Sequence, residues 1–242
     1  MGPAPVRARS ALPYRLLMGV EPAPGGWLVV PGHLQGITLA PQPAFLLQTL
    51  ADVLDYRPAP EIVALHSPVG LFAQPGQIRP CDTAARHRLG PRANAVVRAP
   101  SRALLEAASY EHAKAIDPSL DVVGWAALKR AGEVAQEVQS WRQQVVWEVH
   151  PELAFAEMNG GVPIPFARRS AHGRRTRQEL LTQNLAGCER VIEARPRSVR
   201  ETKLLDALAD LWTARRIVAR AITRMSDPPM WDDEGVRMDI VC

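Results

Sequence analysis

Acidic and histidine side chains close or interrupt apolar runs at four places in the chain: Glu21, His66, Glu148 with His150, and Asp206. Glu148 and His150 lie two residues apart, so a strand would point both side chains to one face. Carboxylate oxygens are the ligands that Mg²⁺ requires, and imidazole nitrogen is acceptable to Mn²⁺ or Zn²⁺. Side chains of these types can bind a metal or transfer a proton, and their spacing alone does not choose between such roles.

Each candidate also has a structural interpretation that the sequence leaves open. Glu148 and His150 can form the polar end of a strand at the sheet rim, and His66 can be a strand-end histidine with a hydrogen bond. Asp206 can be a charge favoured by the dipole at a helix N-terminus. Asp82, which follows Cys81, can be a helix N-cap rather than a catalytic group.

The apolar periodicity indicates the elements that position these residues. We expect strands at 16–20, 27–30, 35–39, 61–66 and 144–150, and helices at 45–54, 101–115, 119–140 and 204–223. The first three strands are joined by short turns and form an antiparallel meander. This order predicts an α/β fold with a mixed five-stranded sheet in a single domain, residues 13–242. A helical insertion covers about 72–142, and residues 1–12 form a flexible N-terminal arm.

Composition and charge limit the function classes. The 242 residues contain no apolar run near the roughly 18 residues that a membrane span needs. Cys81, Cys188 and Cys242 form no CxxC pair, which argues against a structural zinc site. The odd cysteine count and the absence of a secretory signal predict a cytoplasmic protein.

The positive charge is almost entirely arginine. Only three of the 29 basic residues are lysines, so 26 are arginines, and the net charge is +4. The guanidinium group binds two oxygens at once, which favours phosphate or carboxylate partners and permits nucleic acid. We expect phosphate contacts from arginines near the acidic residues: Arg79, Arg86, Arg168, Arg174 and Arg177. The alternative is a solvated helix face paired with glutamates.

Cys81 with His66 or His87 offers another kind of site, with a cysteine nucleophile. It would need a lowered thiol pKa and a base within hydrogen-bond reach. Gly25-Gly26 and Gly160-Gly161 are turn glycines rather than phosphate loops, because no nucleotide-binding string accompanies them.

Several local strings occur together and in a characteristic order. They are Gly19-Val20-Glu21, Leu65-His66-Ser67-Pro68-Val69-Gly70-Leu71, Arg79-Pro80-Cys81-Asp82, Glu148-Val149-His150-Pro151-Glu152, and Leu204-Leu205-Asp206-Ala207. With them the chain resembles, over about residues 16–242, an uncharacterised bacterial family of predicted RNase H-like nucleases. The resemblance implies an RNase H-like sheet, in agreement with the expected meander.

The resemblance also implies a set of site residues. Glu21, Glu148 and Asp206 would be catalytic, and the same three with His66 would hold Mg²⁺ or Mn²⁺, which activates water and stabilises the leaving oxygen. Asp82 and His150 would be auxiliary. Glu148 and Asp206 keep the family pattern, whereas Glu21 and His66 stand where the family usually has Asp.

Two kinds of function therefore remain open. The first is a metal-dependent nuclease or phosphodiesterase acting on nucleic acid. The second is a catalytically inactive RNase H-like protein that binds nucleic acid or has a regulatory role. It is suggested by two of the four expected ligands, which differ from the family pattern. A small phosphorylated substrate is a third possibility, and the sequence does not determine the oligomeric state.

Overall fold

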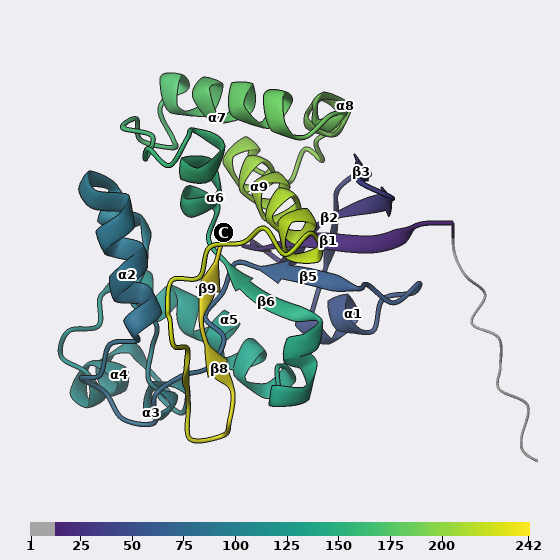
Figure 1. Ribbon diagram of the computed structural model, residues 1–242. Helices are drawn as coiled ribbons and strands as arrows, with labels where there is room; N and C mark the ends of the chain where they lie inside the picture. Colours follow the sequence, from purple (N-terminus) through teal and green to yellow (C-terminus); the bar gives the residue numbers. More distant parts are fainter. Residues whose placement is uncertain (1–12) are drawn as a thin grey trace, which may run out of the picture.

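In the computed structural model, which describes residues 13–242, a seven-stranded sheet lies between two layers of helices (Figure 1). The predicted N-terminal arm, residues 1–12, lies outside the described residues. The strand order is β3-β2-β1-β5-β6-β9, and β4 also pairs with β2. The strands are β1 (Arg15–Ala23), β2 (Gly26–Gln35), β3 (Thr38–Pro41), β4 (Phe45–Leu47), β5 (Ile62–Leu65), β6 (Val146–Val149) and β9 (Ile240–Val241), and a separate two-stranded sheet contains β7 (Met230–Trp231) and β8 (Arg237–Met238).

The strand directions are mixed. β1, β2 and β3 form an antiparallel meander, and β5, β6 and β9 continue the sheet in parallel from β1. The predicted α/β fold with a mixed sheet that begins with a meander is confirmed. The predicted five strands correspond to β3, β2, β1, β5 and β6, and the sheet is larger than predicted because β4 and β9 join it.

The segment 45–54 differs from its predicted helix. Residues Phe45–Leu47 are a strand, β4, and helix α1 covers only Leu50–Leu54. Thr49 caps the helix by accepting from the amide of Asp52, whose carboxylate accepts from the amide of Thr49 in return. This capping box sets the start of the helix and leaves the preceding apolar residues to pair with β2.

Helices fill the connection between β5 and β6, where the sequence predicts a helical insertion. They are α2 (Pro80–Leu89), η1 (Gly90–Ala95), α3 (Arg102–Leu105), α4 (Tyr110–Ile116), α5 (Val122–Glu137) and η2 (Ser140–Gln144). The expected helix 101–115 is two helices, because Ser109 is extended and caps the start of α4. The remaining helices are α6 (Pro151–Met158), α7 (Ala171–Asn184), α8 (Cys188–Glu193) and α9 (Glu201–Val218), the last ending before the predicted residue 223.

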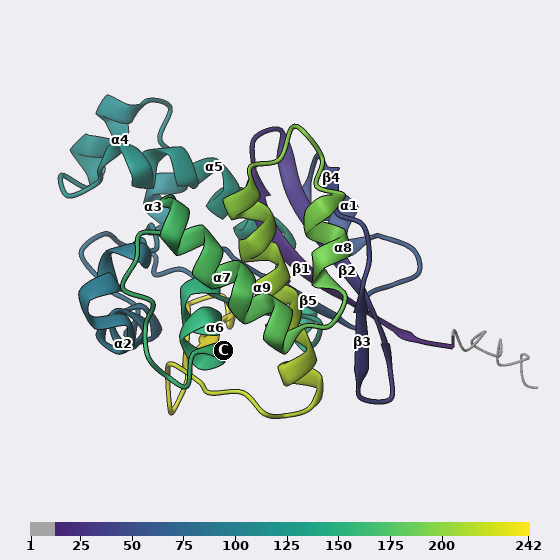
Figure 2. The same ribbon diagram turned by 90° about the horizontal axis from the view of Figure 1, so that it is seen from above.

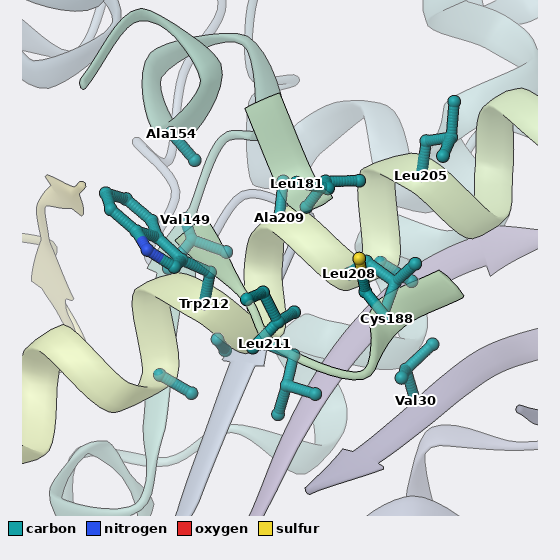
Figure 3. Close-up of a cluster of buried hydrophobic side chains, with 14 of the residues drawn as sticks. Val30, Val149, Ala154, Leu181, Cys188, Leu205, Leu208, Ala209, Leu211 and Trp212 are labelled. Atoms are coloured by element: carbon teal, nitrogen blue, oxygen red, sulfur yellow. The ribbon is translucent and has the colours of Figure 1, made fainter. Parts of the chain in front are cut away.

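The larger hydrophobic core lies between the sheet and α9. Figures 1 and 2 show α6, α7, α8 and α9 over one face of the sheet, with α9 closest to β1. Figure 3 shows part of this core, in which Leu208 and Leu211 of α9 meet Val30 of β2 and Val149 of β6. The opposite face packs against α1 and α5. No described helix has both the length and the apolarity that a membrane crossing requires.

Gly19 allows the close approach of α9 to β1. A Cβ atom on this residue would lie 2.1 Å from the carbonyl oxygen of Ala207 and 2.4 Å from the amide nitrogen of Leu211. Both are backbone atoms of α9, so no rotamer change could relieve the overlap. Glycine at this position therefore determines the spacing between the helix and the strand, and with it the position of the polar residues that follow on both elements.

Candidate active site

Two adjacent parallel strands bring Glu21 and His66 together. Gly19 and Glu21 point to the face covered by α9, because side chains alternate along a strand and Gly19 faces that helix. His66 follows β5 directly, and its amide donates to the carbonyl of Val20 at 2.9 Å. The Nδ1 atom of His66 is in hydrogen-bond contact with Oε1 of Glu21. The two residues at which the chain departs from the family pattern are thus bonded to each other.

Helix α9 contributes a polar face to the same place. Lys203, Asp206 and Asp210 recur at spacings of three and four residues, which puts them on one side of a helix. The Nζ atom of Lys203 donates to Oε2 of Glu21 at 2.6 Å. Glu21 and Asp210 are each 0% exposed and Asp206 is 1% exposed. We call these three carboxyl groups the acidic centre.

Three basic side chains cover the acidic centre, and we call them the basic rim: His66, Lys203 and Arg168. Arg168 comes from the segment between α6 and α7, and its Nη1 donates to Oδ2 of Asp206 at 2.5 Å. The rim side chains are 24%, 21% and 29% exposed, in that order. Solvent therefore reaches the rim but not the carboxylates beneath it.

The electrostatics of the acidic centre differ from one carboxyl group to the next. Burial raises the pKa of Glu21, but the charges of His66 and Lys203 outweigh it and hold that pKa at about 2. Burial, reinforced by the charge of Glu21, raises the pKa of Asp206 to about 7, although Arg168 opposes the shift. The rim thus keeps Glu21 ionised, whereas the pKa of Asp206 lies near neutral pH.

Asp210 is the least satisfied member of the acidic centre. Neither of its carboxyl oxygens accepts a hydrogen bond from a donor group, although Glu21 lies close enough to share a proton with it. Burial and the nearby charges of Glu21 and Asp206 raise its pKa well above the ordinary value for aspartate. A buried carboxyl group without a partner is costly, so it is expected to hold a proton or to bind a cation.

Glu148 lies outside the acidic centre. It is the cross-strand partner of Leu65, which is the partner of Val20, so these three side chains share one face of the sheet. Glu21 follows Val20 and points to the other face. Both oxygens of Glu148 accept from Arg79, at 2.7 and 2.8 Å, and one also accepts from the amide of Val69 at 2.7 Å. The resemblance implied that Glu148 lies with Glu21 and Asp206. The structure instead places it on the opposite face of the sheet.

Asp82 belongs to the same separate network. Its carboxylate accepts from Nε and Nη2 of Arg79, at 3.1 and 2.5 Å. It also accepts from the amide of Ala99 at 3.3 Å, and it makes no N-cap bond to α2. Arg79, Asp82 and Glu148 are 3%, 1% and 6% exposed. We call these three residues the Arg79 network. Its hydrogen bonds connect β6, α2 and the segment after β5, which is a structural role.

His150 lies next to the basic rim as the N-cap of α6. Its Nδ1 accepts from the amide of Glu152 at 3.2 Å, and its Nε2 lies 3.2 Å from the carbonyl oxygen of Ala95, an arrangement that assigns the proton to Nε2. Its ring centroid is 4.7 Å from that of His66. Burial, with the neighbouring His66, lowers the pKa of His150 to about 3. The imidazole is therefore neutral and fixed in orientation.

The five arginines expected to bind phosphate have different environments. Arg79 and Arg177 are buried, and Arg177 pairs with Glu152 at 2.7 Å. These two are unsuited to an incoming phosphate because their guanidinium groups are already bound inside the protein. Arg86 is exposed, while Arg168 and Arg174 are half-buried and paired with carboxylates. The expectation of phosphate contacts is retained for these three.

The cysteine alternative loses its chemical basis. Burial raises the pKa of the Cys81 thiol to about 12; the charge of Arg79 opposes this shift and the nearby carboxylates reinforce it. Cys81 is 0% exposed. A thiol in this state carries almost no thiolate at neutral pH, so it is not an activated nucleophile.

Two residues of the site are missing from the set predicted from sequence. Asp210 lies four residues after Asp206, and helical spacing alone could have indicated it. Lys203 carries the charge opposite to that of a metal ligand, and its bond to Glu21 spans 182 positions, so no local pattern indicates it. Within residues 13–242, no three His, Cys, Asp or Glu side chains are arranged as a ready-made metal site.

The chain matches a known family over most of its length. The model of the family described as "Protein of unknown function (DUF429)" matches residues 19–230. The chain belongs to the DUF429 family. The matched range includes Glu21, His66, Asp206 and Asp210, so the family region contains the whole acidic centre. No curated protein and no solved structure matches the chain.

Proposed function

We propose that this DUF429 protein is a divalent-metal-dependent hydrolase that cleaves phosphodiester bonds in nucleic acid. One observation carries the proposal: Lys203 joins Glu21 of β1 to the side of α9 that carries Asp206 and Asp210, and the buried Asp210 carboxyl group accepts no hydrogen bond. Carboxylates concentrated at one point are the ligand set for Mg²⁺ or Mn²⁺.

The fold supports this proposal. A meander followed by parallel strands, in the order β3-β2-β1-β5-β6, is the arrangement expected of an RNase H-like sheet. The acidic centre lies at the end of β1 and on the helix α9 that crosses it. An acid on the first strand and acids on a late helix are the positions at which RNase H-like enzymes hold their metals.

The acidic centre offers oxygen ligands of the kind a hard cation takes, and the ion pairs of Lys203 and Arg168 would have to open for a cation to bind there. Glu21, Asp206 and Asp210 would hold it through oxygen, and the unpartnered oxygens of Asp210 would gain the partner they lack. A bound Mg²⁺ or Mn²⁺ would supply an activated water and stabilisation of the leaving oxygen. Glu148 has no place in this ligand set because Arg79 binds both of its oxygens.

The basic rim has its own part in the proposed reaction. Lys203 and Arg168 neutralise Glu21 and Asp206 in the free protein. Both have long side chains and are partly exposed, so they can turn towards the phosphates of a substrate while a cation replaces them at the carboxylates. His66 orients Glu21 through Nδ1, and the ring of the neutral His150 packs edge-on against the ring of His66.

The proposal is tested by metal-dependent stabilisation and by cleavage. At 100 times its dissociation constant, Mn²⁺ should raise the melting temperature by about 5 to 10 °C, because it binds the folded state alone. Asp210→Asn should abolish the shift and the cleavage of single-stranded and duplex oligonucleotides. The control Asp233→Asn changes an exposed aspartate and should leave both unchanged.

Two results would contradict the hydrolase. One is cleavage that survives Asp210→Asn and Asp206→Asn unchanged. The other is the absence of any Mn²⁺-dependent shift in the wild-type protein. Hydrolysis of small phosphorylated compounds, with oligonucleotides left intact, would keep the metal site but assign it another substrate.

A second candidate function is supported by the basic rim itself. Lys203 and His66 bond the two oxygens of Glu21, and Arg168 bonds Asp206, so the protein's own groups already neutralise these two carboxylates. The protein would then bind nucleic acid without hydrolysing it, through its arginine side chains.

Lys203→Met distinguishes the two functions. In a metal-dependent hydrolase, removal of this competing positive charge should tighten Mn²⁺ binding by about tenfold, or about 1.4 kcal/mol. In a binding protein without a metal, the variant should lose stability and gain no response to Mn²⁺. Titration calorimetry of the wild-type protein and the variant with Mn²⁺ measures the difference.

A further inference from the structure

The segment between α6 and α7 presents an exposed aromatic side chain next to the acidic centre. Phe166 is 41% exposed, and its ring centroid lies 3.9 Å from that of His172 at an interplanar angle of 63°. Arg168, two residues further along, reaches Asp206. Two residues span less than about 8 Å of chain, so the backbone of Phe166 lies close to that of Arg168, a residue of the basic rim.

Buried contacts hold this segment in place. Arg177 is 1% exposed and binds both oxygens of Glu152, at 2.8 and 2.7 Å. Its Nη1 donates to the carbonyl of Phe166 at 3.3 Å and to that of Gly173 at 2.8 Å. A Cβ on Gly173 would lie 2.1 Å from the carbonyl oxygen of Ala167, so the segment packs directly on α7. The exposed ring is therefore pre-organised, and a ligand would lose little entropy in ordering it.

Two exposed arginines lie close to the aromatic pair along the chain, Arg169 three residues after Phe166 and Arg175 about one helical turn after His172 in α7. Arg169 and Arg175 are exposed and make no ion pair with another described residue. Their neighbours in the same segment are paired, Arg168 with Asp206 and Arg174 with Glu201. Two unpaired guanidinium groups beside an exposed aromatic ring suit a ligand that carries both phosphate and a flat apolar surface.

We propose that the ring of Phe166, supported edge-to-face by His172, is a stacking platform for an unpaired nucleobase, with Arg169 and Arg175 contacting the adjacent phosphates. The ligand class is single-stranded nucleic acid, because the bases of a duplex stack on one another and leave no face for a side chain. The inference deepens the proposed function by naming the substrate of the same site. It depends on that function only for what happens to the strand after it binds.

Binding without metal tests the platform separately from hydrolysis. A fluorescein-labelled 12-nucleotide single-stranded DNA and the matched duplex are titrated in EDTA and followed by fluorescence anisotropy. Phe166→Ala should weaken single-strand binding about tenfold, the loss of one stacked base, and leave duplex binding unchanged. Phe166→Trp should restore the affinity. Arg169→Gln should weaken binding and reduce the salt dependence by about 0.7 in log–log slope.

Trp141 supplies the matched control. It is 65% exposed on η2 and has the guanidinium of Arg142 at 4.8 Å from its ring, so it is also an exposed aromatic beside an arginine. Trp141→Ala should leave single-strand binding unchanged. The platform is wrong if the wild-type protein does not bind the single strand, if Phe166→Ala binds it like the wild type, or if both alanine variants lose affinity equally.

The outcomes for the two proposals are separable. Single-strand binding that depends on Phe166, in a protein that cleaves nothing when metal is added, would keep the platform and remove the hydrolase. Cleavage that requires Asp210 and is indifferent to Phe166 in both binding and rate would keep the hydrolase and remove the platform.

Discussion

Arg79→Met is expected to lower the free energy of unfolding by about 3 to 5 kcal/mol, the cost of leaving buried charges without their partner. Arg79 is 3% exposed and binds Glu148 and Asp82, together with the carbonyls of Val69 and Gly70. It thereby joins β6, α2 and the segment after β5. Urea denaturation of the wild-type protein and the variant measures the difference.

An exposed ion pair provides the control for this prediction. Arg15 and Glu61 form a salt bridge whose side chains are 49% and 43% exposed. Solvent screens such a pair, so Arg15→Met should cost only about 0 to 1 kcal/mol. Equal losses in the two variants would show that the Arg79 network contributes no more to stability than a surface pair.

The cost of Arg79→Met should also depend on pH. Burial raises the pKa of Glu148, and Arg79 opposes that shift, so removing the arginine raises this pKa further. A carboxyl group whose pKa is higher in the folded state destabilises the fold as pH rises, because the unfolded state ionises more easily. The difference between variant and wild type should therefore be larger at pH 8 than at pH 5, and a difference that is constant across this range would contradict the assignment.

Gly19→Ala is expected to destabilise the protein by about 2 kcal/mol or more and to remove the response to Mn²⁺. The added methyl group would overlap backbone atoms of α9, at 2.1 and 2.4 Å, so the helix must move away from β1. The movement would separate Glu21 from Asp206 and Asp210, which lie on the two elements. Denaturation and Mn²⁺-dependent melting follow the two effects in the same samples.

Gly132→Ala is the control for the effect of replacing a glycine. Gly132 lies within α5, and a Cβ there would meet nothing within 4 Å. Alanine is the better helix former, so this variant should be neutral or more stable by up to about 1 kcal/mol. If both variants retained wild-type stability and the Mn²⁺ response, the close packing of α9 on β1 would not be needed for the site.

The helical and strand periods account for what could be predicted. The continuous apolar run of β1 and the spacing of the leucines on α9 are local patterns, and both are visible in the chain order. The helix predicted at 45–54 was wrong in its first half, because pairing of Phe45–Leu47 with β2 prevailed over a helical spacing. Local periodicity does not register such a partner, which is supplied by a strand elsewhere in the chain.

The candidate site, too, was predicted correctly only in part. Glu21, His66 and Asp206 were predicted together from the resemblance, and the structure brings them together. Glu148 was grouped with them, yet strand register turns its side chain to the other face of the sheet, where Arg79 binds it. A shift of one residue in register reverses the face of a side chain, and register depends on contacts between strands.

The sequence by itself determined the mixed α/β fold, its antiparallel beginning, and the presence of acids and arginines in particular segments. It could do so because periodicity and residue type are properties of neighbours along the chain. Only the tertiary structure decided which charges meet. Lys203 with Glu21, Arg168 with Asp206, and Arg79 with Glu148 are pairs formed across 182, 38 and 69 positions. The sequence does not distinguish an arginine that binds phosphate from one that forms a buried ion pair. Its burial and its partners in the folded protein make that distinction.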